Sequence, residues 1–190
     1  MTGPAFSAGV RGVMDSVVEL IIAGTVGSGF VWGPDVVVTS AHVVPQGPVM
    51  VRLPNGQERS ARVRLADRDR DIALLDVPSL GLPAVRSGDP TALRIGQTLF
   101  AVGHPLGVRY AMSSGILHAV GPLPDGYPLP PHARRLTWVQ ADLRLAPGNS
   151  GGPIADARGR VVGVSTMIAA GLALAVPITA VDALLRSRAA

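Results

Sequence analysis

The apolar residues of this chain occur in short runs, and this pattern constrains the fold more than any other feature of the sequence. The runs are rich in valine, isoleucine and leucine, and they are separated by glycine, proline, asparagine and aspartate. Many short apolar runs bounded by turn-forming residues favour an all-β barrel or sandwich over alternating β and α units. The expected strands are 17–23, 29–32, 36–39, 49–53, 60–66, 72–77, 98–102, 111–120, 136–140, 152–154, 160–165 and 172–176.

The segments outside these runs carry further signals. Asn55-Gly56, between two expected strands, predicts a β-hairpin with a type I′ turn. Only the tail, 177–188, shows apolar residues at helical spacing, and Pro177 can open that helix. The segment Ser79–Ile95 is rich in glycine, proline and serine, and we expect it to link two groups of strands.

The composition fits one globular domain. The chain has 190 residues, of which 47% are hydrophobic and 16% charged, so it can bury a sizeable core. The absence of cysteine excludes disulfides, thiol chemistry and cysteine-ligated metal sites. We expect neither a metal nor a cofactor.

The basic residues are all arginine, and the net charge is +4. Six of the 17 arginines lie between Arg52 and Arg70, which taken alone would suggest a nucleic-acid surface. However, Arg62 and Arg64 alternate with apolar residues in "ARVRLA", as on a strand with one face in water. We therefore expect no nucleic-acid partner.

No segment of the chain has the pattern of a membrane span or an export signal. The uncharged stretch 161–181 is interrupted by glycine, serine, threonine and proline, so two short buried strands explain it better than a bilayer span. Near the start, Glu19 interrupts the apolar run of "VVELIIAGTV", which makes it a poor signal-peptide core. The compartment stays open: cytoplasmic, or extracytoplasmic if an upstream segment has been removed.

The stretch "LAPGNSGGP", 145–153, surrounds one serine with glycines. A nucleophilic serine needs an exposed hydroxyl, a base and donors for the oxyanion that forms. Glycines permit a tight turn with positive φ and leave backbone N–H groups accessible. The same glycines could also serve a plain turn. If they serve catalysis, Ser150 is the candidate nucleophile, with the N–H groups of Gly148 and Ser150 as the candidate oxyanion hole.

The stretch "GNSGG" also matches G-x-S-x-G, the nucleophile elbow of α/β-hydrolases, in which the catalytic histidine comes later in the chain than the serine. Here the last histidine is His132, and Pro153 stands where the elbow requires a helix. This alternative fails, so the base must lie upstream of Ser150.

His42 in "TSAHVV" and Asp71 in "DIALLDV" are the candidate base and the acid that orients it. We expect the remaining histidines, His104, His118 and His132, to be structural. The acidic turn "ADRDRD" could pass for a metal site, but its interleaved arginines make it poor at binding a cation.

The order histidine, aspartate, serine and the three surrounding motifs resemble trypsin/chymotrypsin-like serine proteases, particularly the HtrA/DegP branch. The intervening "LRIGQTLFAVGHPLG", "SSGILHAVG", "VQADLRLAPGNSGGP", "GRVVGVST" and "GLALAVPI" resemble that branch in the same order. The resemblance covers roughly 17–183 and implies a serine endopeptidase acting on unfolded or flexible polypeptides through an acyl-enzyme.

The resemblance also implies the architecture. Two six-stranded antiparallel β-barrels would face each other across the active site within a single domain, 1–190. The N-terminal barrel, 17–78, would carry His42 and Asp71, and the C-terminal barrel, 96–176, would carry Ser150. The linker would be 79–95 and the C-terminal helix 177–188.

Substrate preference would come from Leu145, Ser165, Thr166 and Met167. Leu145 and Met167 suggest a shallow apolar pocket for small or medium aliphatic P1 side chains. Arg144 would favour acidic residues if it pointed inward, but an unpaired buried guanidinium is costly, so we expect it to face solvent. By alignment of "GVST", Ser165 is also expected to hydrogen-bond near Asp71.

Family members typically carry PDZ domains after the protease, and we expect none within this chain, which ends soon after "AVDALLRSR". A homotrimer is common in the family, and the oligomeric state of this chain stays open. The alternative function is a catalytically silent, protease-like peptide-binding or chaperone module.

Overall fold

Six strands of the N-terminal half close into an antiparallel barrel in the order β1-β2-β3-β6-β5-β4. The computed structural model describes residues 3–22, 24–44 and 47–187, so Ala23 and Arg188, at the ends of two expected elements, lie outside the described residues. The strands of this barrel are β1 (Val17–Ile22), β2 (Thr25–Gly33), β3 (Val36–Thr39), β4 (Val49–Arg52), β5 (Glu58–Asp67) and β6 (Ile72–Asp76).

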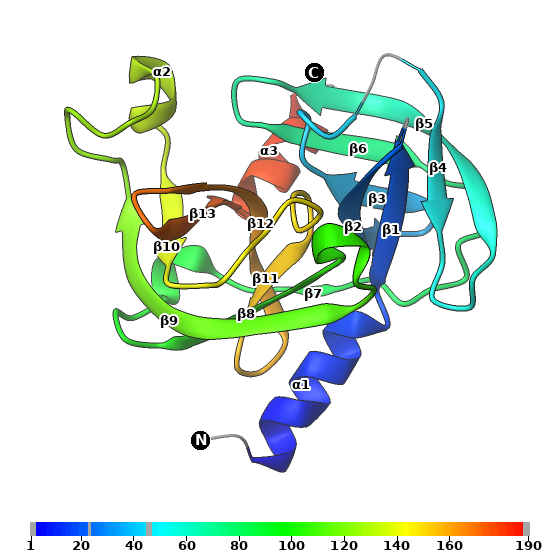
Figure 1. Cartoon of the computed structure of the whole chain (residues 1–190), viewed down its shortest axis with the longest axis horizontal. Helices are drawn as coiled ribbons and strands as arrows, with labels where there is room; N and C mark the ends of the chain where they lie inside the picture. The colour runs from blue at the N-terminus through cyan, green and yellow to red at the C-terminus, as the bar shows by residue number, and fades with distance from the viewer. Residues whose placement is uncertain (1–2, 23, 45–46, 188–190) are drawn as a thin grey trace.

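A second barrel stands beside the first (Figure 1). Its order is β11-β8-β9-β10-β13-β12, and an additional pairing of β11 with β12 closes it. Its strands are β8 (Thr98–Gly103), β9 (Ala111–Gly121), β10 (Trp138–Ala141), β11 (Pro153–Asp156), β12 (Arg160–Ala169) and β13 (Leu172–Pro177). The predicted fold class, two six-stranded antiparallel barrels with a short C-terminal helix, is confirmed.

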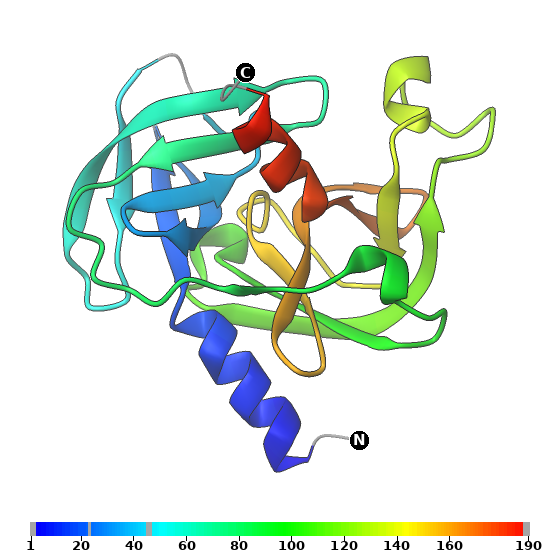
Figure 2. The same ribbon diagram turned by 180° about the vertical axis from the view of Figure 1, so that it is seen from behind.

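Strand β6 shows how the barrels are joined. Its side chains alternate between two cores: Ala73 and Leu75 face the interior of the first barrel, whereas Ile72 and Leu74 join a cluster that includes residues of the second barrel. Both faces are buried, which explains the continuous apolar run of "DIALLDV". The cluster between the barrels also contains Val181 of the C-terminal helix α3 (Thr179–Arg186), seen from behind in Figure 2.

Two helices were not expected from the sequence. Helix α1 (Pro4–Met14) packs Phe6 edge-on against Phe100 of the second barrel, with ring centroids 5.5 Å apart. Phe6, Val10 and Val13 have helical spacing, but three glycines in and next to this helix weaken its helical signal. The single turn α2 (Pro131–Arg134) lies in a proline-rich loop and is too short to show a period.

Three local expectations are corrected. The segment expected to be irregular contains the short strand β7 (Arg86–Ser87), which pairs in parallel with β12. The β4–β5 hairpin forms, but its turn is not type I′, because Asn55 lacks the positive φ that this turn requires and only Gly56 has one, at +84°. Strand β10 begins two residues later than expected, because the Leu136 N–H closes the α2 turn on the Ala133 carbonyl.

None of the helices among residues 3–22, 24–44 and 47–187 is both long enough and apolar enough to cross a bilayer.

The contact between α1 and the β11–β12 turn generates a prediction. A Cβ at Gly9 would lie 2.9 Å from the Gly159 nitrogen, whereas a Cβ at Gly12, in the same helix, would meet nothing within 4 Å. Alanine favours a helix over glycine by about 0.5–1 kcal/mol, so Gly12→Ala should raise the free energy of unfolding by that amount. Gly9→Ala should lower it by about 1–3 kcal/mol, because the helix must move away from the turn. Equal stabilisation of both variants in urea unfolding would contradict the close contact.

Candidate active site

His42 and Asp71 meet because β3 and β6 are neighbours. Thr39 pairs with Ala73, so the turn that follows β3 and the residue that precedes β6 lie at the same end of the first barrel. Asp71 accepts two hydrogen bonds from His42, at Oδ1 from the backbone N–H (2.8 Å) and at Oδ2 from the ring Nδ1 (2.7 Å). With Nδ1 donating to Asp71, Nε2 is the ring nitrogen left free to accept a proton.

The backbone at Asp71 is in the left-handed region, with φ +58°. This conformation is uncommon outside glycine, although aspartate and asparagine adopt it more readily than other residues. It turns the carboxylate back over the His42 turn while the chain continues into β6. The His42 side chain is half exposed, whereas that of Asp71 is 16% exposed, so the carboxylate is the more shielded of the two.

The loop that carries Ser150 is bound to both barrels. The Ser150 carbonyl accepts from the Ser28 N–H of β2 (3.0 Å), and the Gly151 N–H donates to the Ser165 carbonyl of β12 (2.7 Å). Gly151 has φ +84°, and a Cβ there would collide with Thr39 and Ser28 of the first barrel. Glycine is therefore required at this position for both its conformation and its size.

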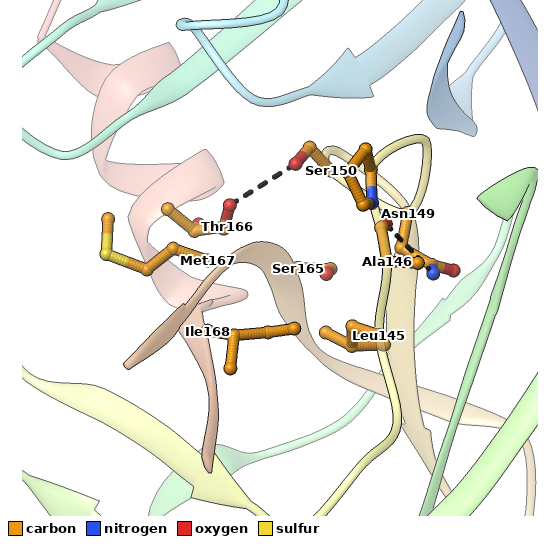
Figure 3. A pocket seen from close by; sticks show the side chains of 9 residues that line it. Leu145, Ala146, Asn149, Ser150, Ser165, Thr166, Met167 and Ile168 are labelled. Atoms are coloured by element: carbon orange, nitrogen blue, oxygen red, sulfur yellow. Dashed lines mark hydrogen bonds between the residues drawn. The ribbon is translucent and has the colours of Figure 1, made fainter. Parts of the chain in front are cut away.

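The Ser150 hydroxyl points towards β12. Its Oγ donates to the Thr166 carbonyl at 3.3 Å (Figure 3). Among the described residues, no hydrogen bond joins Ser150 Oγ to the His42 ring. Hydrogen bonds thus join two of the three candidate catalytic residues, His42 and Asp71, whereas the hydroxyl of the third, Ser150, donates to the Thr166 carbonyl.

The candidate oxyanion donors lie on a bend at Gly148, which has φ +104°. The Pro147 carbonyl accepts from the Leu106 N–H at 2.8 Å. Because the C=O and N–H of one trans peptide point in opposite directions, this bond turns the Gly148 N–H away from Leu106. In the part of the chain that the structure describes, the N–H groups of Gly148 and Ser150 donate to no other group.

A pocket of about 290 Å³ lies beside Ser150. Its lining includes all four residues expected to contact substrate and contains no charged side chain. The lining residues are Leu145, Ala146, Pro147, Asn149, Ser150, Ser165, Thr166, Met167 and Ile168. Figure 3 shows Leu145 and Ile168 facing each other across it.

Two expectations about neighbouring residues have different outcomes. Arg144 is exposed and is not part of the pocket lining, as expected. Ser165 is buried, and its carbonyl accepts from Ser40 Oγ at 3.0 Å. No hydrogen bond joins Ser165 to Asp71 among the described residues, so that expectation is not met; both carboxylate oxygens of Asp71 accept from His42 instead.

A second pocket, of about 390 Å³, adjoins His42 and Asp71. Thr166 and Met167 line both pockets, so the two hollows adjoin the same short stretch of β12. The second pocket combines apolar side chains, Leu129, Leu136 and Trp138 among them, with Arg68, Asp69 and His132. His132, expected to be structural, thus lies in the same hollow as the candidate base.

Ser28 contacts the loop that carries Ser150, although it is not among the residues predicted from the sequence. Its Oγ donates to the Gly148 carbonyl at 2.6 Å and accepts from the His104 N–H at 3.0 Å. The signal that could have found it is Gly27-Ser28-Gly29, because glycines inside a strand often mark the close approach of another backbone.

His104 is fully buried beside Ser28, its ring edge-on to that of Tyr110. Nδ1 lies 3.1 Å from Ser28 Oγ, and Nε2 has no hydrogen-bond partner within the described part of the chain. Burial lowers the pKa of His104 from 6.5 to about 4; the Glu19 charge opposes this shift, and those of Arg109 and Arg52 add to it. The imidazole is therefore neutral at neutral pH.

Charged side chains of the other candidate features form ion pairs. Asp67 in the acidic turn pairs with Arg70 at 2.7 Å, and within the described residues no group of three histidine, aspartate or glutamate side chains could hold a metal ion. In the arginine-rich stretch, Arg52 pairs with Glu19 and Glu58, and Arg64 with Asp76.

Comparison with known proteins gives consistent matches. The sequence model of the family described as "Trypsin-like peptidase domain" matches residues 27–164. "Probable periplasmic serine endoprotease DegP-like" of Ectopseudomonas mendocina is 38% identical over 149 residues, which cover 77% of this chain and 30% of that protein. HhoB of Synechocystis sp. is 38% identical over 80% of this chain and 37% of its own length. The chain thus spans about a third of the length of these curated relatives.

Solved structures agree. The HtrA-type protease AlgW with tripeptide superposes with a TM-score of 0.86 and 26% identity, covering 97% of this chain and 63% of AlgW. The inactive form of a serine-to-alanine mutant of Rv3671c from M. tuberculosis H37Rv superposes with a TM-score of 0.81 and 26% identity, covering 97% of this chain and 93% of that one.

The buried His104 generates a prediction. Between pH 6.5 and about 4 the unfolded chain binds a proton at this residue and the folded chain does not, so stability falls as the pH is lowered through this window. The slope contributed is at most about 1.4 kcal/mol per pH unit. His104→Asn should therefore lose less stability on acidification than the native chain, whereas His132→Asn, at an exposed histidine with no ion pair among the described residues, should follow the native curve. Denaturant unfolding at pH 7, 6, 5 and 4.5 measures this, and identical slopes for all three proteins would contradict it.

Proposed function

Because the chain belongs to the trypsin-like peptidase domain family, we propose that it is a serine endopeptidase that cleaves polypeptides through His42, Asp71 and Ser150. The observation that carries the proposal is the pair of hydrogen bonds from His42 to Asp71, at 2.7 and 2.8 Å. They orient the imidazole, fix the proton on Nδ1 and leave Nε2 as the base.

The first step is attack by Ser150. Rotation about its Cα–Cβ bond exchanges the acceptor of the hydroxyl, from the Thr166 carbonyl to His42 Nε2. Oγ then bonds to the carbonyl carbon of the substrate while its proton passes to Nε2. The adjacent Asp71 carboxylate stabilises the imidazolium that results.

The tetrahedral intermediate then collapses. Its oxyanion accepts from the N–H groups of Gly148 and Ser150, which are otherwise unused within the described residues. The C–N bond breaks, and the leaving amine takes the proton from Nε2. Water, deprotonated by His42, hydrolyses the acyl-enzyme and regenerates Ser150.

The substrate is an extended, flexible or unfolded polypeptide. The pocket beside Ser150 is lined by Leu145, Met167 and Ile168 and contains no charged side chain. An apolar hollow of about 290 Å³ accommodates a small or medium aliphatic P1 side chain, and burying a carboxylate there would cost free energy without a partner for its charge.

A catalytically silent, peptide-binding or chaperone module is the second candidate. It is favoured by the orientation of the Ser150 hydroxyl, which bonds to Thr166 rather than to His42. In that case the cleft would hold peptides without cleaving them.

Fluorophosphonate labelling separates the two candidates. The native chain should label, and Ser150→Ala and His42→Ala should both abolish labelling, because the probe needs the nucleophile and its base. Labelling that survives Ser150→Ala would contradict the assignment of the nucleophile. Absence of labelling in the native chain, together with suppression of a client protein's aggregation, would favour the binding module.

A peptide library varied at P1 tests the pocket. Valine, alanine and leucine should give the highest kcat/KM, and aspartate and glutamate values at least about tenfold lower, a difference of about 1.4 kcal/mol. Arg144→Ala should leave this ranking unchanged, since the side chain is exposed and outside the pocket. A strong preference for acidic P1 residues that Arg144→Ala removes would overturn the aliphatic prediction.

A further inference from the structure

Both peptide units of Gly148 are held by hydrogen bonds. The unit before it is held at the Pro147 carbonyl by the Leu106 N–H (2.8 Å), and the unit after it at the Gly148 carbonyl by Ser28 Oγ (2.6 Å). A glycine at φ +104° with no side chain has few other restraints on its orientation. The direction of the Gly148 N–H therefore depends on these two bonds.

The Ser28 hydroxyl has one orientation available. It carries a single proton, and the 2.6 Å contact shows that the hydroxyl donates this proton in a hydrogen bond to the Gly148 carbonyl. Its Oγ then accepts from the His104 N–H at 3.0 Å and from the His104 Nδ1 at 3.1 Å. Ser28 is fully buried, so bulk water does not compete for these bonds.

The space around this contact leaves little room for rearrangement. A Cβ on Gly103 would lie 2.8 Å from Ser28 Oγ and 2.7 Å from Asn149 Oδ1, and a Cβ on Gly148 would collide with the His104 carbonyl. The hydroxyl and the Gly148 carbonyl are thus confined by backbone on several sides.

Ser28 belongs to the first barrel, and the loop it holds belongs to the second. Its backbone N–H donates to the Ser150 carbonyl (3.0 Å), and its side chain donates to the Gly148 carbonyl (2.6 Å). Both residues whose N–H groups would bind the oxyanion are therefore tied to this one residue. We propose that Ser28 is a positioning residue that sets the geometry of the oxyanion hole from the opposite barrel; this rests on the proposed peptidase function.

The test compares Ser28→Ala with Ser16→Ala. Ser16 is a matched control, because it is equally buried and its hydroxyl donates to a backbone carbonyl, that of Gly12 in α1, away from the catalytic loop. The measurements are kcat and KM for an alanine- or valine-P1 peptide, and Ki for the corresponding peptide aldehyde. The hemiacetal that the aldehyde forms with Ser150 places its oxygen where the oxyanion forms.

Ser28→Ala should lower kcat by about 10- to 100-fold with KM within about twofold, and weaken aldehyde binding by a similar factor. Complete loss of an oxyanion donor costs about 100- to 1000-fold in kcat, and here the donors remain but are misaligned. Interactions made only in the transition state change kcat rather than KM. Ser16→Ala should lower thermal stability and leave all three constants unchanged.

Unchanged kcat and Ki in Ser28→Ala, with native turnover intact, would overturn the role of Ser28 and leave the peptidase intact. Absence of turnover and labelling in the native chain would overturn both. If Ser28→Ala does not fold, Ser28→Cys takes its place: its thiol is a weak donor of similar shape, and the same two outcomes apply.

Discussion

The close approach of the two barrels at the loop 148–152 is the constraint on which the rest of the site depends. Gly103, Gly148, Gly151 and Gly152 each leave no space for a side chain, because backbone or side-chain atoms of the facing segments occupy it. The interface therefore excludes water where the serine loop meets β2, and the loop's hydrogen bonds cross from one barrel to the other. The pairing of β3 with β6 brings the candidate residues His42 and Asp71 together, and this contact between the barrels positions Ser150 relative to them.

The parts of the site differ in how far they are assembled. The candidate base His42 and the candidate acid Asp71 are hydrogen-bonded, and the Gly148 peptide is held by Leu106 and Ser28. The hydroxyl of the candidate nucleophile Ser150 donates to a different acceptor, the Thr166 carbonyl. The proposed mechanism therefore requires the Ser150 hydroxyl to leave the Thr166 carbonyl and donate to His42 Nε2 instead.

The sequence predicted the strands well because period-two and buried apolar runs follow directly from sheet geometry. It identified His42, Asp71 and Ser150 as candidates because each stands in a motif with its own local pattern. It failed for α1, whose glycines weaken the helical signal, and for the type I′ turn, where Pro54 before Asn55 already supplies a turn position with negative φ. Ser28 carries only the weak signal of its two flanking glycines, and its proposed role depends on a contact with a residue 120 positions away.

The left-handed backbone at Asp71 has a consequence for which side chains the position accepts. Glycine, asparagine and aspartate tolerate that region of conformational space best, so chain geometry alone reduces twenty candidates to a handful. Of those, aspartate alone brings the negative charge that the proposed mechanism needs beside the imidazolium. The backbone conformation and the charge requirement thus favour the same amino acid independently. Glutamate would supply the negative charge, but it adopts the left-handed conformation less readily than aspartate.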